Sequence, residues 1–159
     1  MTRNASLVAA NRLALVVPLA LMAGALGSQY IGGLYPCEMC HWQRWPHYAA
    51  ILVAAVAFAA TGGTRRALVL LAALLIAVSG GIGVFHAGVE YGWWPGITGC
   101  TSTVRPTGSP EDMLAQIMNA PMIRCDVPQW TFAGISLAGF NAIISLVGAS
   151  AAALLALKR

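Results

Sequence analysis

The run ALVLLAALLIAVSGGIGVFHAG, from Ala67 to Gly88, decides how this chain folds. It contains no Asp, Glu, Lys or Arg, and it is longer than the roughly 20 residues with which an α-helix crosses the hydrocarbon core of a bilayer. Lipid offers no hydrogen-bond partners, so a run that crosses it must satisfy its own backbone N–H and C=O groups, as a helix does. The run therefore predicts a transmembrane helix.

Three other apolar runs accompany it, at 13–33, 132–157 and, shorter, 45–60. The shortest reaches spanning length only if its helix begins near Cys40, so we expect a span at about 41–60 with polar residues in its outer turn. The chain is 58% hydrophobic and 9% charged, with a mean hydropathy of +0.73, whereas about a quarter of the residues in soluble domains are charged. We therefore predict an all-α membrane protein, one domain over residues 1–159 built as a four-transmembrane-helix bundle.

Basic residues indicate the orientation of this bundle. They gather in the N-terminal arm, in the turn between the second and third runs, and at the C-terminal end: Arg3, Arg12, Arg65, Arg66, Lys158 and Arg159. These three segments fall on one side of the membrane, which the positive-inside rule assigns to the cytoplasm. Residues 34–40 and 89–131 are then outer loops, and they hold every Asp and Glu of the chain. A cleaved signal peptide in place of the first span is the alternative, and it leaves the other spans oriented as before.

The long outer loop contains one candidate helix. Ser109 is a suitable N-cap, Pro110 suits the first helical position, and Glu111 and Asp112 suit the first turn. An apolar face would follow, made of Met113, Leu114, Ile117 and Met118. Such a helix could lie in the membrane surface or pack on top of the bundle, and the sequence favours neither.

The four cysteines, Cys37, Cys40, Cys100 and Cys125, all fall in the outer loops, where disulfides persist. Four cysteines allow three pairings, and pairs within each loop are the simplest. The Cys37–Cys40 ring would constrain little chain and make a poor staple, while a helix start after Pro36 would lower the pKa of the Cys37 thiol, so this pair favours redox chemistry. The Cys100–Cys125 pair is equally suited to a structural role.

Two further side chains are candidates for the same site. Arg44 follows Cys37 and Cys40 at helical spacing, and at the membrane edge it either anchors to headgroups or stabilises a thiolate or an acceptor carbonyl. His86 is expected at a similar depth on the neighbouring span, where it either closes this pocket or serves as an interfacial histidine. Pro46 disfavours helix at the residue before it, so the shared face could be bent.

Taken together, these stretches resemble the DsbB family of bacterial disulfide-forming quinone reductases. The resemblance covers nearly the whole chain and is carried by Pro36–Cys40, Trp42–Pro46, Phe85–Glu90, Cys100, Cys125–Asp126 and Gly134–Leu137.

The resemblance implies a thiol:quinone oxidoreductase of the bacterial inner membrane, with its cysteine loops in the periplasm. Cys100 and Cys125 would reoxidise a periplasmic, thioredoxin-like dithiol oxidase similar to DsbA, with Cys100 forming the mixed disulfide. The electrons would pass through Cys37 and Cys40 to a membrane quinone, either ubiquinone or menaquinone. In the family the second CxxC cysteine, here Cys40, lies against the quinone ring, and the residues matched by Arg44 and His86 line the quinone site.

Three rival interpretations remain open. Cys37 to His41 also matches the CxxCH attachment motif of c-type haem, but a membrane cytochrome leaves the long-loop cysteines unexplained. A metal-binding structural protein would use Cys37, Cys40, His41 and His86. A dedicated oxidase for one specific partner would keep the same fold and site. His41 and His47 have no assigned role.

Overall fold

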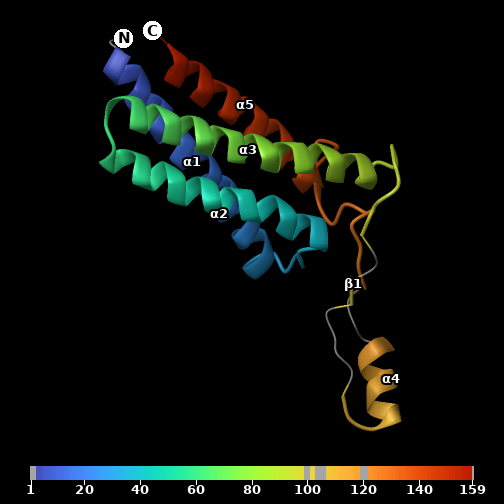
Figure 1. Cartoon of the computed structure of the whole chain (residues 1–159). Coiled ribbons are helices and arrows are strands. Elements are labelled where there is room, and N and C mark those ends of the chain that lie inside the picture. The colour runs from blue at the N-terminus through green and yellow to red at the C-terminus, as the bar shows by residue number, and fades with distance from the viewer. Residues whose placement is uncertain (1–2, 99–100, 103–106, 119–121, 159) are drawn as a thin grey trace.

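The computed structural model describes residues 3–98, 101–102, 107–118 and 122–158. Four long helices in this part of the chain form a bundle: α1 (Arg3–Tyr30), α2 (Glu38–Ala59), α3 (Gly62–Glu90) and α5 (Leu137–Leu157) (Figure 1). The long loop carries the short helix α4 (Pro110–Met118). It also carries two antiparallel pairs of two-residue strands, β1 (Thr101–Ser102) with β2 (Met122–Ile123), and β3 (Thr131–Phe132) with β4 (Ile135–Ser136).

Helix α3 lies at the centre of the packing, against both α2 and α5, while α1 lies against α2 and α5 on the other side. The buried core of the bundle is largely alanine, including Ala50 and Ala54 of α2, Ala72 of α3 and Ala152 of α5. Small residues let helix backbones approach closely, which is how helices associate when lipid removes the usual hydrophobic driving force. Large apolar side chains such as Leu52, Leu74, Val147 and Leu154 point outward instead.

Three of the four long helices are long and apolar enough to cross a membrane, namely α3, α5 and the Asn4–Tyr30 part of α1. Helix α2 does not meet the same criterion among the described residues, because its first half carries Glu38, His41, Gln43 and Arg44. The prediction of an all-α membrane protein is therefore supported by three spans, with α2 as a fourth, more polar member of the bundle.

The predicted helix limits need correction at several points. Helix α1 begins at Arg3 rather than at residue 13 and ends at Tyr30, before the expected limit of 33. Helix α2 begins at Glu38, earlier than expected, and ends at Ala59. Helix α3 extends the predicted 67–88 span at both ends, to Gly62 and to Glu90, so the long loop starts later than residue 89.

The largest error lies at 132–136, which was expected to be helix and is a tight hairpin. Ala133 and Gly134 both have positive φ, 50° and 77°, as two-residue hairpin turns require. Ser136 then caps α5, its Oγ accepting a hydrogen bond of 3.1 Å from the N–H of Gly139. Tyr91, just after α3, joins the hairpin to that helix, because its hydroxyl donates to the carbonyl of Gly134 (2.9 Å) and accepts from the N–H of Ser136 (2.8 Å).

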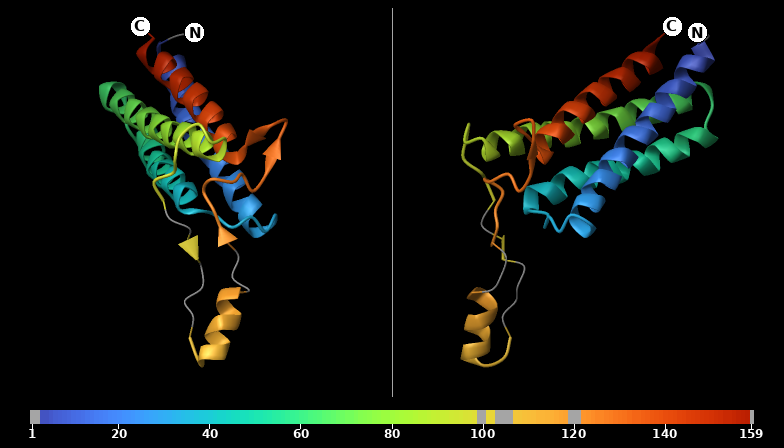
Figure 2. Two further views of the ribbon diagram at one scale, coloured as in Figure 1. Left: turned by 90° about the vertical axis from the view of Figure 1, so that its right-hand side faces the viewer. Right: turned by 180° about the vertical axis from the view of Figure 1, so that it is seen from behind.

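Helix α4 forms where the sequence predicts it. Ser109 Oγ accepts from the N–H of Asp112 (3.2 Å), and Asp112 Oδ2 accepts in return from the N–H of Ser109 (3.3 Å), a reciprocal cap. Figure 2 shows α4 standing apart from the four long helices, beyond the β1–β2 pair. Of the two alternatives left open for this helix, packing on top of the bundle is therefore not observed, and its contact with a membrane surface stays a prediction.

The packing of α3 on α5 predicts that alanine substitutions at two glycines of α3 differ sharply in their effect on stability. A methyl group at Gly83 would lie 3.0 Å from the carbonyl oxygen of Ala138 and 3.0 Å from the backbone N of Ala142, whereas one at Gly81 would meet nothing within 4 Å. We expect Gly83→Ala to destabilise the fold by about 1–3 kcal/mol, because backbone cannot yield as a side chain can. Thermal unfolding in detergent measures this, with Gly81→Ala as the matched control. Equal melting temperatures for the two variants would contradict the proposed close approach.

Candidate functional site

The candidate site lies at the end of the bundle opposite the two chain termini, where α2 begins and α3 ends (Figure 1). Cys37, Cys40, His86 and Cys125 meet there. Cys37 Sγ lies 2.8 Å from Cys40 Sγ and 3.6 Å from His86 Nε2. The sulfurs of Cys37 and Cys125 and the Nε2 of His86 all lie within 4.8 Å of one another. The structure thus brings five of the six predicted site residues to one end of the bundle; the sixth, Cys100, lies outside the described residues.

The described cysteines are thiols rather than disulfides. A disulfide needs a sulfur separation of about 2.05 Å, shorter than the 2.8 Å between Cys37 and Cys40. Cys37 is 2% exposed and Cys125 is 8% exposed, so both sulfurs are withdrawn from solvent. The two outer loops thus meet at Cys37.

Cys37 is the N-cap of α2, and this departs in detail from the expectation that Pro36 would take the first helical position. The Cys37 Sγ accepts a hydrogen bond of 3.2 Å from the N–H of Cys40, as a serine or aspartate oxygen does at other N-caps. Because the sulfur closes this turn, the two cysteine side chains are held side by side before any disulfide forms.

The pKa values of the two thiols move in opposite directions. The hydrogen bond with Cys40 and burial raise the pKa of the Cys37 thiol, and the hydrogen bond from Cys37 lowers the pKa of Cys40. Arg44 adds a smaller lowering effect on Cys40. The expectation that Cys37 would be the more acidic thiol was therefore wrong, since its neighbour and its burial outweigh the helix N-terminus.

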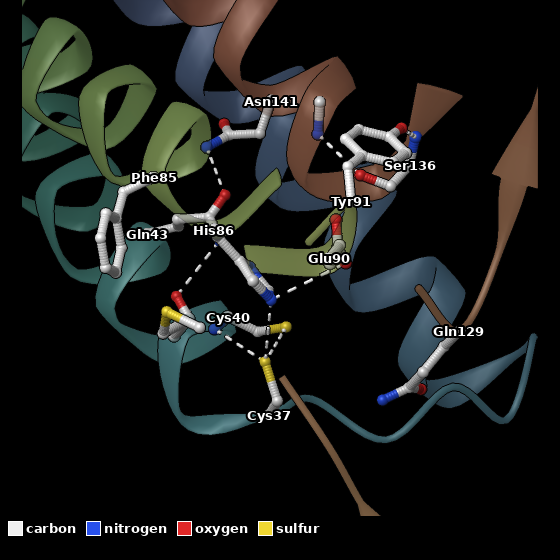
Figure 3. A network of polar contacts seen from close by, with 12 residues as sticks. Cys37, Cys40, Gln43, Phe85, His86, Glu90, Tyr91, Gln129, Ser136 and Asn141 are labelled. Carbon is white, nitrogen blue, oxygen red and sulfur yellow. Dashed lines mark hydrogen bonds and ion pairs between the residues drawn. The ribbon is translucent and has the colours of Figure 1, made fainter. Parts of the chain in front are cut away.

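His86 lies between the cysteines and the interior of the bundle (Figure 3). Gln43 Nε2 donates a 2.8 Å hydrogen bond to His86 Nδ1. This leaves the proton of the neutral ring on Nε2, the atom that faces Cys37 at 3.6 Å. The ring is therefore oriented by α2 and presents one defined atom to the thiols.

Glu90 is a site residue that the sequence reasoning did not single out. Its side chain is 7% exposed, and Oε1 lies 3.7 Å from His86 Nε2. Its second oxygen, Oε2, is buried and has no hydrogen-bond partner among the described residues. The spacing of four residues between His86 and Glu90 places both on one face of a helix and was the signal available in the sequence.

Arg44 finds its partners on α1 rather than at the membrane surface. Nη1 donates to Gln29 Oε1 (2.6 Å) and Nη2 donates to the carbonyl of Ala25 (3.2 Å). Helix α2 runs through Pro46 without interruption. The bend that Pro46 could have caused therefore does not separate Arg44 from the cysteines. Cys37, Cys40 and Arg44 line one cavity, as their spacing predicts.

That cavity has a volume of about 410 Å³, within the range of small-molecule sites. Its polar lining includes Cys40, Arg44, His86 and Glu90. Its other walls are largely apolar and come mainly from α1 and α5, including Leu21, Met22, Ala25, Leu137, Phe140 and Ile144. It can accept a flat, mostly apolar molecule that carries one or two hydrogen-bond acceptors.

Beneath the cavity, a buried polar network joins α2, α3 and α5. Gln43 Oε1 accepts from Asn141 Nδ2 (2.8 Å), and His47 Nε2 lies 2.9 Å from both Asn141 Oδ1 and Ser79 Oγ. His47 had no assigned role, and Gln43, Ser79 and Asn141 were not predicted as its partners. Their signal was a set of polar residues within otherwise apolar runs, and a buried hydrogen-bond network of this kind fixes how helices meet.

The long loop is tied to the CxxC segment just after Cys125. Gln129 Nε2 donates to the carbonyl of Tyr35 (2.6 Å), next to the CxxC motif. Within the loop, Arg124 and Asp126 on either side of Cys125 form an ion pair of 2.6 Å, which lowers the pKa of the Asp126 carboxyl. The Gln129 contact holds the segment that carries Cys125 beside the start of α2.

The opposite pKa directions predict the order in which the thiols react. In the reduced protein, iodoacetamide should modify Cys40 at a lower pH than the 9.0 of an ordinary thiol, because the thiolate fraction rises as pH passes the lowered pKa. Cys37 should stay unmodified at that pH. Peptide mass spectrometry across a pH series measures both. Cys37→Ala removes the hydrogen-bond donor, so it should move the Cys40 profile to higher pH; an unchanged profile would contradict the coupling.

Comparisons with known proteins give a matching family model and a curated relative. The family model described as "Disulfide bond formation protein DsbB" matches residues 8–155. A curated protein named "Disulfide bond formation protein B" from Polaromonas sp. is 32% identical over 146 residues, covering 81% of this chain and 80% of the relative. No solved structure matches significantly.

Proposed function

Because the chain belongs to the DsbB family of disulfide bond formation proteins, we propose that it is an inner-membrane thiol:quinone oxidoreductase that reoxidises a periplasmic, DsbA-like dithiol oxidase. Family membership makes it a disulfide oxidoreductase, and the donor and the acceptor are the proposed parts. The observation that carries the proposal is the position of Cys37, whose sulfur has Cys40 on one side and Cys125 of the long loop on the other. Electrons that enter at the loop therefore have a thiol path to the cavity.

The proposed topology has four spans, with both termini in the cytoplasm and the cysteine end in the periplasm. Both termini lie at one end of the bundle (Figure 1), which an even number of crossings requires. Basic residues at that end, among them Arg12, Arg65 and Arg66, favour the cytoplasmic side. Helix α2 completes the count as a span whose polar half finds its partners inside the bundle.

The first step is exchange with the soluble partner. A thiolate of the reduced partner attacks Cys100 of a Cys100–Cys125 disulfide, giving a mixed disulfide and releasing Cys125 as thiolate. The partner's second thiol then displaces Cys100. The partner leaves oxidised, and Cys100 and Cys125 hold its two electrons.

The second step moves those electrons between the loops. The Cys125 thiolate attacks Cys37 of a Cys37–Cys40 disulfide, and Cys40 leaves as thiolate. Cys100 then attacks Cys125, which re-forms the long-loop disulfide and releases Cys37. The sulfurs of Cys125 and Cys37 lie within 4.8 Å of each other, and the lowered pKa of Cys40 makes it the better leaving group.

The cavity suits a quinone head group as the final acceptor. A quinone supplies a two-electron sink that reaches the site through lipid. Arg44 and His86 are the residues that would hold its carbonyl oxygens, and Cys40 is the thiolate that faces it. The buried, unpaired oxygen of Glu90 on the same cavity fits a site built for a polar ligand group. A partner at about −120 mV can only be reoxidised by a stronger oxidant, and a quinone meets that need.

Closing the Cys37–Cys40 disulfide also releases the Cys37 proton. His86 Nε2, 3.6 Å from Cys37 Sγ, and Glu90 Oε1, 3.7 Å from that nitrogen, form a short line of groups that can carry this proton from the thiol into the cavity. Two electrons and one proton thus leave the pair at the same place, and the second proton of quinone reduction comes from outside the pair because Cys40 is already a thiolate.

Substitutions at the cavity should affect quinone reduction. With a reduced thioredoxin-fold donor and quinone as the acceptor, Cys40→Ser should abolish turnover. Arg44→Ala should lower turnover roughly 10- to 100-fold, because a charge-assisted hydrogen bond contributes about 1.5–3 kcal/mol. Absorbance of the quinone measures the rate. His41→Ala, at an exposed position on α2, is the control that should keep its rate. The Gln29→Ala variant removes a hydrogen-bond partner of Arg44 and leaves the charge of Arg44 in place. If this variant lost as much activity as Arg44→Ala, the result would indicate that Arg44 acts through packing alone.

The proposed exchange between loops predicts a trapped disulfide. In a Cys40→Ser/Cys100→Ser protein only Cys37 and Cys125 remain, and mild oxidation should link them, as mass spectrometry of unreduced peptides would show. Cys37→Ser/Cys100→Ser keeps Cys40 and Cys125 and should give far less linked product, because Cys40 is not part of the close group of Cys37, His86 and Cys125. Equal yields from the two proteins would exclude Cys37 as the receiving thiol.

A further inference from the structure

A second property of the site concerns its reduced state. The sulfurs of Cys37 and Cys125 and the Nε2 of His86 come from three separate segments, are buried, and lie within 4.8 Å of one another. Two thiolates and an imidazole are the donors that zinc prefers in proteins. The proposed electron relay does not require a nitrogen of His86 to lie close to the sulfurs of both Cys37 and Cys125.

The spacings fit tetrahedral coordination. With Zn–S of about 2.3 Å and Zn–N of about 2.0–2.1 Å, the S···N edge of a tetrahedron is about 3.6 Å. Cys37 Sγ and His86 Nε2 are 3.6 Å apart. The third donor, Cys125 Sγ, lies within 4.8 Å of both, so a small side-chain rotation closes the remaining distance.

Glu90 lies outside this close group of three donors but beside it. Its Oε1 lies 3.7 Å from His86 Nε2, and its side chain is 7% exposed. Its Oε2 is buried without a partner in the described part of the chain. Figure 3 shows the carboxyl group of Glu90 turned toward His86. A side-chain rotation of Glu90 toward the two sulfurs would complete a four-ligand site.

We propose that the reduced protein binds one Zn²⁺ ion through Cys37, Cys125, His86 and Glu90, and that this ion blocks the thiol relay. Binding converts two thiols to thiolates and releases two protons, with no change in oxidation state. The His86 ring then binds the ion through Nε2 and carries its proton on Nδ1, which displaces the hydrogen bond that Gln43 Nε2 donates to Nδ1. Zinc binding itself is independent of the proposed quinone activity; only the block of the relay rests on it.

Direct metal binding tests this proposal without an activity assay. The purified protein is reduced, freed of reductant under anaerobic conditions, and titrated with Co²⁺ as a spectroscopic probe and with Zn²⁺ against a chelator. We expect one ion per chain, Co²⁺ bands of a tetrahedral site with thiolate ligands, and X-ray absorption of the zinc form showing two sulfur and two nitrogen or oxygen neighbours. Uptake no greater than that of a protein with all four cysteines changed to serine would overturn the proposal.

Matched variants distinguish zinc binding at this site from zinc binding by the two cysteines of the CxxC motif alone. Cys125→Ser and His86→Ala should weaken Zn²⁺ binding roughly 100-fold or more, since even changes to outer-shell partners weaken metal sites 10- to 100-fold. Cys40→Ser, Cys100→Ser and His41→Ala should bind within a few-fold of the unchanged protein. The reverse pattern, with binding lost in Cys40→Ser and kept in Cys125→Ser, would overturn the proposal. If a variant failed to fold, the number of sulfur and histidine neighbours in the unchanged protein would still decide.

Discussion

Polar side chains inside this bundle must find partners on other helices, because lipid provides none. Helix α2 carries several of them, and together they reach all three of the other long helices. Arg44 binds the end of α1, Gln43 binds His86 of α3 and Asn141 of α5, and His47 binds Asn141 and Ser79. Meeting these requirements together leaves α2 little freedom to shift or rotate, so the same contacts that hold the bundle also aim the CxxC motif at the cavity.

The two ends of the bundle solve different problems. Toward the termini, alanines let the helices approach closely. Toward the cysteines, larger and polar residues replace them, and a cavity of about 410 Å³ lies among α1, α2, α3 and α5. Cys37 and Cys40 line this cavity, and the long loop reaches them through Cys125.

The sequence predicts the helices well and the meeting of the loops poorly. Apolar runs define α1, α3 and α5 because membrane helices need length and little else, and the cap at Ser109 is local. The hairpin at Thr131–Ser136 was missed because residues 132–135 continue the apolar run of α5. Only the positive φ angles of Ala133 and Gly134, which the structure reveals, mark the turn. Cys125 and Cys37 meet through contacts between distant segments, which spacing cannot show. The opposite pKa directions of Cys37 and Cys40 depend on burial and on a sulfur–sulfur hydrogen bond that exist only once the chain has folded.

The phenol of Tyr91 gives the protein a modular architecture. One hydroxyl group links the end of α3 to the hairpin that starts α5, so the chain between them leaves the bundle and returns to it at nearly the same point. The part of this insertion that lies beyond the β1–β2 pair can therefore vary in length without moving the ends of α3 and α5. Evolution can lengthen or shorten this outer part, while the four helices and the cysteine end stay constant.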